Sequence, residues 1–303
     1  MAARSTTELV VEVINSVEEL EALPGYTKNI DPAQVELDTI IAVYDLPNEI
    51  ACQKKTCHQP HNNGCVVKLS DGNVTNIGNK CGKKLYSEKF TLQKLQADRY
   101  IKRMNVVRLL TAKKQNDQSI KDTLTSTHTS AKTVTDLIKQ LEVYFGSKLV
   151  NKIRSKALKQ EYDVYTFTQL TEKEIEIRRE TGNASKRVLN EERIKVGTLA
   201  YIDFFAKDVR SMYFDKIYPA YTELLQANID SMPTPALNKL QRKISDAERA
   251  SREIPDIETE ALSFSQHRKN FELLNFIADE LPFEEASLAK SGIDRYIHMN
   301  KQL

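Results

Sequence analysis

The spacing of apolar positions changes along the chain. Residues 7–50 alternate irregularly between apolar and polar positions and are rich in β-branched side chains, which predicts at least one strand, over about 37–45. Residues 65–69 and 74–78 are also strand-like, and Asp71-Gly72 stands between them. Because an Asp-Gly pair readily forms a tight turn, this stretch predicts a β-hairpin.

From about residue 91 the apolar positions recur at the spacing of a helix. Residues 115–130 are polar and rich in Ser and Thr, which predicts a linker, and residues 163–170 are expected to connect two helices. The first helix is expected to bury a stripe of Leu92, Leu95, Tyr100, Met104, Val107 and Leu110. Helical regions are expected at about 131–145, 147–160, 171–229, 235–252, 257–280 and 284–299, with breaks at Gly146, Pro233, Pro255 and Pro282.

These patterns predict a mainly α protein. Residues 1–90 are expected to form a small α+β, zinc-ribbon-like module, and residues 91–303 an extended helical bundle or coiled-coil-like region, with divisions near 115–130 and 231–235. Apolar runs stay shorter than the roughly 20 residues that a membrane-spanning helix needs. The N-terminus lacks the pattern of a secretory signal, so we expect a cytoplasmic protein with no membrane partner.

The four cysteines lie within one short stretch, at Cys52, Cys57, Cys65 and Cys81. A disulfide scaffold would spread them along the chain, whereas a reduced protein can keep such a cluster as a metal site. Zinc takes four soft or borderline ligands in a tetrahedron, and two ligand groups on either side of a hairpin can supply them. We expect a structural Zn²⁺ bound by Cys52, Cys57, His61 and Cys81.

Two further residues compete for the fourth position. Cys65 begins a strand on which Cys65, Val67 and Leu69 share one face, so this thiol is also a candidate core residue. His58 is the other candidate, next to Cys57 in the same loop. His61 is favoured because it precedes Asn62-Asn63-Gly64, a loop from which its ring can turn inward.

The pattern C-x4-C-x3-H-x2-G-x-V-V-K-x-S-D-G-x-x-T-N-I-G-x-x-C-G-K-K resembles the N-terminal cysteine-rich module of poorly characterised proteins from phages, prophages and other bacterial mobile elements. The positions that match its metal ligands are Cys52, Cys57, His61 and Cys81, and position 65 is usually apolar in that pattern. The resemblance covers about forty residues. It implies a zinc module in a protein of bacterial or phage origin, in a bacterial cell or an infected host cell, but it implies no reaction.

Charge is distributed unevenly along the chain. Residues 1–51 hold two basic and ten acidic residues, a net charge of −8, whereas residues 52–115 hold fourteen basic and three acidic residues, a net charge of +11. A basic block of this kind favours a surface that binds a polyanion. Two alternatives remain open: the acidic segment packs against the block and neutralises it, or the block is simply a solvated helix face.

The basic residues expected to contact nucleic acid lie in the zinc module and on the first helix. Tyr86, Phe90 and Tyr100 are interleaved aromatics that can stack on bases or anchor the helix in the core. Charge contacts of this kind are made with phosphates and do not read sequence. The expected contact residues are Lys54, Lys55, Lys83, Lys84, Arg99, Lys102 and Arg103.

Together these features favour a zinc-stabilised nucleic-acid-binding protein, with DNA favoured over RNA. A closed zinc site leaves no position for a reacting water, and the common phosphate-loop, hydrolase and deaminase motifs are missing from the sequence, so an enzyme is disfavoured. No small-molecule substrate is expected. A first alternative is a scaffold or protein-interaction module in phage–host conflict, with a protein partner or a homo-oligomer, and a second is a nuclease-type enzyme.

Overall fold

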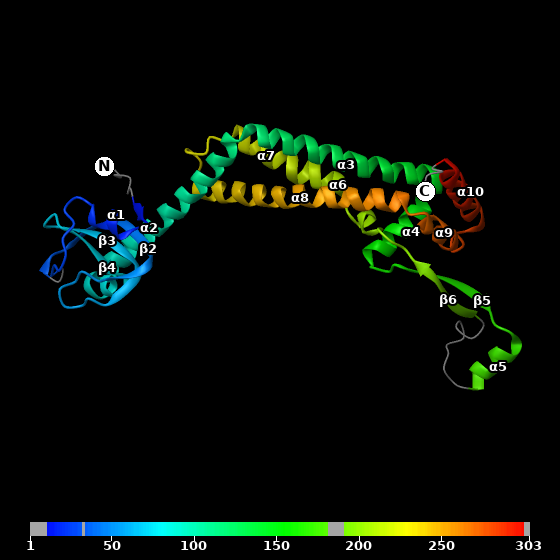
Figure 1. The fold of residues 1–303 in the computed structure, drawn as a ribbon, viewed down its shortest axis with the longest axis horizontal. Coiled ribbons are helices and arrows are strands. Elements are labelled where there is room, and N and C mark those ends of the chain that lie inside the picture. Colours follow the sequence, from blue (N-terminus) through cyan, green and yellow to red (C-terminus); the bar gives the residue numbers. More distant parts are fainter. Residues whose placement is uncertain (1–10, 32–33, 181–190, 300–303) are drawn as a thin grey trace, which may run out of the picture. The chain divides into compact units, whose positions relative to one another are not determined.

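The computed structural model describes residues 11–31, 34–180 and 191–299. The chain divides into two compact units, Met1–Lys113 with Asn228–Asn238 and Lys114–Ala227 with Lys239–Leu303 (Figure 1). The fold is mainly helical with a small N-terminal α+β module, as the sequence predicts. The first unit extends beyond the predicted boundary at residue 90, because it includes most of the long helix that follows the sheet. The finer description of the second part as an extended bundle stays a prediction.

A four-stranded sheet forms the centre of the first unit. The order is β1-β2-β3-β4; β1 pairs in parallel with β2, and the other pairs are antiparallel. The strand predicted at 37–45 lies within β2, and the predicted hairpin is β3–β4, so both are confirmed. Its turn has Gly72 at φ 90°, a conformation that glycine adopts without strain. The elements are β1 (Glu12–Ile14), α1 (Val17–Glu21), β2 (Leu37–Ala51), β3 (Pro60–Leu69) and β4 (Val74–Gly78).

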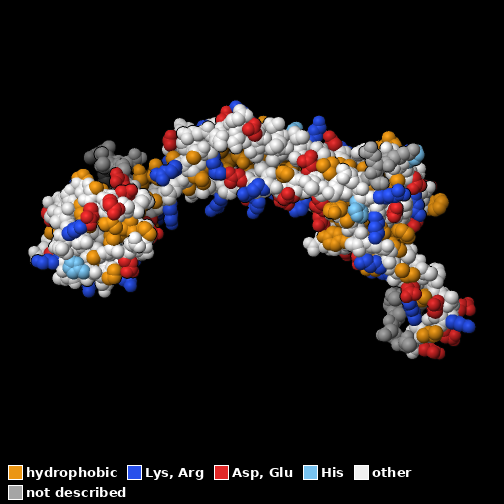
Figure 2. Space-filling view, in the orientation of Figure 1, with side chains coloured by type: hydrophobic (Ala, Val, Ile, Leu, Met, Phe, Trp, Pro, Cys, Tyr) orange, Lys and Arg blue, Asp and Glu red, His pale blue; other side chains and the backbone are white. Residues whose placement is uncertain are grey.

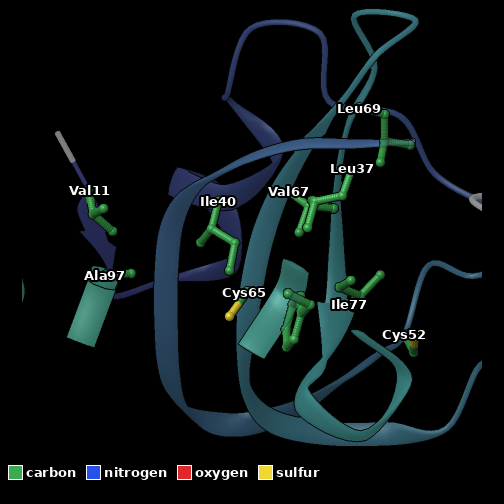
Figure 3. Packing of buried hydrophobic residues seen from close by; sticks show 10 residues of the cluster. Val11, Leu37, Ile40, Cys52, Cys65, Val67, Leu69, Ile77 and Ala97 are labelled. Carbon is green, nitrogen blue, oxygen red and sulfur yellow. The ribbon is translucent and has the colours of Figure 1, made fainter. Parts of the chain in front are cut away.

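Both faces of the sheet are buried. Cys65 and Val67 pack with Phe90 and Ala97 on one face, on which Cys52 also lies (Figure 3). Val66 belongs to a second cluster on the other face, with Leu20 and Tyr44. The alternation predicted along β3 is therefore confirmed, and the Cys65 side chain is fully buried.

Helix α2 (Asn79–Gln115) follows the hairpin and is interrupted at Ser87, which has φ 49° and ψ −118°. Its buried residues include Phe90 and Ala97, whereas Leu92 is 53% exposed and Leu95 45% exposed. The predicted apolar stripe is therefore wrong for Leu92, Leu95 and also Met104, although Val107 and Leu110 are buried. Because Phe90 and Ala97 pack against the sheet, they fix the rotation of the helix about its axis. In this orientation both leucines point outward.

The other elements include most of the helices and a two-stranded antiparallel sheet of β5 and β6. Among the described helices, none is long and apolar enough to cross a bilayer. The elements are α3 (Asp117–Phe145), α4 (Ser147–Leu158), β5 (Asp163–Gln169), α5 (Glu172–Glu180), β6 (Glu191–Thr198), the 3₁₀ turn η2 (Asp203–Ala206), α6 (Val209–Ser211), the π-helical turn η3 (Met212–Ile217), α7 (Tyr218–Gln226), α8 (Thr234–Gln266), α9 (Arg268–Ala278) and α10 (Phe283–Met299).

The Ser/Thr-rich stretch 115–130 is not a linker, because residues from Asp117 onward belong to α3. Its hydroxyl groups are satisfied within the helix: Thr125 donates to the carbonyl of Lys121, and Thr129 donates to the carbonyl of Thr125. Ile120 is buried and holds this part of the helix in the core. The predicted helix end at Gly146 is confirmed.

Three further predictions fail in the second half of the chain. Residues 163–170 are not a simple connector, since β5 pairs with β6 along its whole length. The region 171–229 is not one helical stretch. Its capping box is present, with the Thr171 amide donating to Glu174 Oε2 at 2.8 Å, but α5 ends at Glu180 and β6 follows; residues 181–190 lie outside the described part. Pro255 does not interrupt α8. Proline has no amide hydrogen to donate to the preceding turn, but Pro255 is exposed, so water can satisfy the carbonyl that lacks this donor.

Candidate metal centre

Three cysteines from separate segments meet at one end of the sheet. Cys52 follows β2, Cys57 lies in the loop before β3, and Cys81 is in the first turn of α2. Their sulfur atoms all lie within 4.8 Å of one another. This group could hold a metal ion, and it contains three of the four ligands predicted from the sequence.

Backbone hydrogen bonds fold the loop so that the thiols converge. The Cys52 amide donates to the carbonyl of Gln59 at 3.1 Å, and the Cys57 amide donates to the carbonyl of Lys54 at 2.8 Å. His58 adopts φ 48°, a left-handed conformation that reverses the chain directly after Cys57. The loop is therefore closed on itself at Cys57, and Cys52 is tied to its far end.

Electrostatics differ among the thiols. The backbone of Gln59 and the Cys81 thiol, whose sulfur is 3.2 Å from that of Cys57, lower the pKa of Cys57 by hydrogen bonding. Burial, together with the same contact to Cys57, raises the pKa of Cys81 to about 12. Thiolates bound at about 2.3 Å to a tetrahedral ion stand roughly 3.8 Å apart. The sulfurs of Cys57 and Cys81, now 3.2 Å apart, would therefore move apart only slightly to hold such an ion. Soft thiolate ligands suit Zn²⁺, Cu⁺ and iron.

His61, the predicted fourth ligand, is not brought to this group. Its Nε2 lies 2.7 Å from the Tyr44 hydroxyl, and its Nδ1 lies 3.1 Å from the carbonyl oxygen of Gln59. Because a carbonyl only accepts, Nδ1 carries the proton, and Nε2 accepts from Tyr44. Both ring nitrogens are therefore already engaged, and His61 supports the cysteine loop through Gln59.

The two alternative ligands also have defined places. Cys65 Sγ is 3.8 Å from Asn79 Oδ1, and burial raises the pKa of this thiol to about 11. Cys65 is outside the group of three sulfurs, in agreement with its interpretation as a core residue. The His58 ring is exposed, and its Nε2 lies 2.9 Å from the carbonyl oxygen of Lys55, which leaves Nδ1 directed away from that contact.

A polar network that the sequence did not predict supports the site. Tyr26 donates to Asn76 Oδ1 at 2.6 Å, and Asn76 Nδ2 donates to the Tyr44 hydroxyl oxygen at 3.3 Å and to the carbonyl of Ala51 at 3.2 Å. Asn76 is fully buried. A buried polar side chain in the middle of a hairpin strand is the one sequence signal that points to this network. It fixes the end of β2, directly before Cys52.

Replacing Tyr44 by Phe should destabilise the first unit without removing the metal. The substitution removes the partner of His61 Nε2 and one of the two acceptors of Asn76 Nδ2, which is expected to lower the free energy of unfolding by about 1–3 kcal/mol. Urea unfolding and elemental analysis measure the two effects. Tyr100→Phe is the matched control, because Tyr100 is half-buried on the same unit but outside the network. Equal stability of both variants would contradict a supporting role for Tyr44.

The predicted nucleic-acid contacts fall into two groups. Most are exposed, and Lys54 is half-buried. Arg103 is different, because its guanidinium donates to the carbonyls of Met232 at 2.7 Å and Asp230 at 3.0 Å. Arg103 therefore anchors the segment 228–238 instead of facing solvent freely. Of the interleaved aromatics, Phe90 is buried and serves as a core anchor. The exposed predicted contacts are Lys55, Lys83, Lys84, Arg99 and Lys102.

The chain matches no protein-family model, no curated protein and no solved structure.

Proposed function

We propose that the first unit is a zinc-stabilised module that binds nucleic acid through phosphate contacts. The observation that carries this proposal is the convergence of Cys52, Cys57 and Cys81 from three segments. Exposed lysines flank these ligands: Lys55 lies in the cysteine loop, and Lys83 is two residues after Cys81. A metal ion would fix these segments to one another and so hold the lysines in a constant arrangement.

Zinc is the metal that best fits the group. Three thiolates with one further ligand form a closed tetrahedral site of the kind that stabilises small modules. Among the described residues, no histidine lies with the three sulfurs. We propose His58 as the fourth ligand, because it follows Cys57 and is hydrogen-bonded through Nε2 only, whereas both nitrogens of His61 are hydrogen-bonded. Such a site has no open position, so its role is structural.

Phosphate binding is supported by charge. Residues 52–115 carry a net charge of +11. In the part of the chain that the structure describes, the ion pairs of this unit include those of Lys28 with Glu21 and of Lys94 with Asp98, and none involves Lys55, Lys83 or Lys84. The charges of these three lysines are therefore available to a polyanion, and the contacts they make are sensitive to salt. DNA is the proposed polymer.

Reversing the charges of Lys55, Lys83 and Lys84 to Glu is expected to weaken DNA binding sharply. Each lost phosphate contact lowers the slope of log affinity against log salt concentration by about 0.9, so the triple variant should lose about 3 in slope. Fluorescence anisotropy with labelled duplex DNA and RNA over a salt series measures this. The matched control reverses Lys159, Lys239 and Lys269, which are exposed outside the proposed surface. An unchanged slope in the first variant, or equal loss in both, would refute the proposal.

A second candidate function is protein binding by α2. Leu92 and Leu95 are 53% and 45% exposed and, three residues apart, they share one face of this helix, which gives α2 an exposed apolar surface for a partner. Size-exclusion chromatography with light scattering tests self-association, with Leu92→Gln and Leu95→Gln as disrupting changes. A monomer at all concentrations would leave nucleic-acid binding as the better supported function.

A further inference from the structure

A positively charged cavity lies in the second unit, between α3 and the segment formed by α6 and η3. Its volume is about 270 Å³, and Lys132, Lys139 and Arg210 line it together with a single acid, Asp136. An adjoining cavity of about 470 Å³ shares Lys139 and Arg210, and its lining adds two acids, Glu142 and Asp208, and two further cations, Arg154 and Lys207. The two form a recess large enough for a small anionic ligand.

The π-helical turn η3 places an aromatic side chain at this cavity. Within the turn Tyr213 is buried and packs on the His128 ring, with ring centroids 4.9 Å apart. Phe214, the next residue, is 49% exposed and lines the cavity. The Arg210 guanidinium lies 6.0 Å from the centroid of the Phe214 ring. Single π turns of this kind occur frequently at functional sites.

The cations of this cavity differ from others on the same unit. On the face of the second unit seen in Figure 2, basic and acidic side chains are intermixed. Several cations of this unit form ion pairs. Lys207 pairs with Glu253 at 2.7 Å, for example. By contrast, the structure shows no hydrogen bond or ion pair made by the side chains of Lys132, Lys139 and Arg210 with any described residue. Their charge is therefore available to a bound anion.

We propose that this cavity binds a nucleoside phosphate. Lys132, Lys139 and Arg210 hold the phosphate, and the base stacks on the exposed face of Phe214, which combines charge and aromatic contacts as single-stranded nucleic-acid sites do. The ligand is either a free nucleotide or one nucleotide of a single strand, since a base inside a duplex offers no free face. The inference goes beyond the proposed function: it concerns a different unit and involves neither the metal nor the lysines beside it.

Phe214→Ala tests the base contact in the full-length, metal-loaded protein. Loss of one stacked base is expected to weaken binding of a fluorescein-labelled twelve-residue oligothymidylate or of a fluorescent adenosine triphosphate about tenfold, as measured by anisotropy. Tyr218→Ala is the matched control, because Tyr218 is also 49% exposed but lies outside both cavities. Equal affinity of the Phe214→Ala and wild-type proteins for both probes would overturn the proposal.

Lys139→Gln tests the phosphate contact, with Lys216→Gln as control, since Lys216 is exposed and lines neither cavity. Only the first variant should reduce the salt slope of oligonucleotide binding, by about 0.7. If Phe214→Ala and Lys139→Gln weaken binding of both probes or of the triphosphate alone, the ligand is a free nucleotide, and if they weaken binding of the oligonucleotide alone, the ligand is a strand; either result supports the site. Competition by inorganic phosphate as effective as that by adenosine triphosphate would refute the base contact.

The two proposals fail separately. The variant reversed at Lys55, Lys83 and Lys84 should still bind the fluorescent nucleotide, because that site lies in the second unit. If this triple variant loses duplex binding while Phe214→Ala changes nothing, the inference is wrong and the proposed function stands. The opposite pattern leaves the nucleotide site and removes the proposed function.

Discussion

Replacing Cys81 by Ser is expected to abolish stoichiometric zinc binding and to destabilise the first unit. Cys81 comes from α2, whereas Cys52 and Cys57 come from the segment before the hairpin, so this thiolate is the link between the two sides. A serine hydroxyl is a far poorer zinc ligand than a thiolate. Structural zinc sites contribute their binding free energy to folding, and its loss should lower the stability of the unit by roughly 3 kcal/mol or more.

Two measurements separate metal loss from general unfolding. Elemental analysis gives the zinc content, and hydrogen exchange read by mass spectrometry locates the destabilised segment, which we expect at residues 52–90. Cys65→Ala is the matched control, because Cys65 is buried in the same unit but outside the group of three sulfurs. It should keep its zinc. A full complement of zinc in Cys81→Ser, or none in the wild-type protein, would disprove the site.

The same assay identifies the fourth ligand. His58→Asn should weaken zinc binding if His58 completes the tetrahedron, whereas His61→Asn should keep the metal and lose only stability, since both nitrogens of His61 are held by Tyr44 and Gln59. The reverse result would restore His61 as the ligand predicted from the sequence.

The sequence predicts the convergence of three cysteines for a physical reason. Cysteines confined to a short stretch around a hairpin are brought together by local chain geometry, which spacing reveals. The hydrogen bonds that hold His61 come from Tyr44 on β2 and, through Tyr44, from Asn76 on β4, and spacing along the chain does not reveal them. Arg103 is a similar case. Its charge predicts a phosphate contact, but in the fold its guanidinium donates to the carbonyls of residues 230 and 232, which are distant in the sequence.

The fold shows the same division between local and distant causes. The hairpin β3–β4 is predicted correctly because Asp71-Gly72 encodes its turn locally. The β5–β6 pair is missed, since its strands are separated by α5 and by residues 181–190, and such pairing leaves no local signal. In α3, the predicted linker is a helix because Ile120 and Thr127 are buried, and tertiary packing outweighs the weak helical preference of Ser and Thr.

A close crossing of two helices limits what the second unit tolerates. Gly292 of α10 lies against the end of α3, and a Cβ atom placed there would overlap the carbonyl oxygen of Tyr144. The helices cannot easily move apart. The Tyr296 ring, one turn beyond Gly292, packs on Phe145 and Phe271 with centroids 5.5 and 5.0 Å away. Any shift of α10 therefore disturbs an aromatic cluster in the core.

Gly292→Ala is accordingly expected to lower the free energy of unfolding of the second unit by about 3 kcal/mol, at the upper end for overpacked sites, because the added methyl group meets backbone and not a flexible side chain. Urea unfolding measures the change, and hydrogen exchange should rise along residues 283–299. Ser291→Ala is the matched control. Ser291 precedes Gly292 and its side chain is exposed, so the change in the free energy of unfolding should stay within about 0.5 kcal/mol. If Gly292→Ala is as stable as this control, α10 does not pack directly against the backbone of α3 at Gly292.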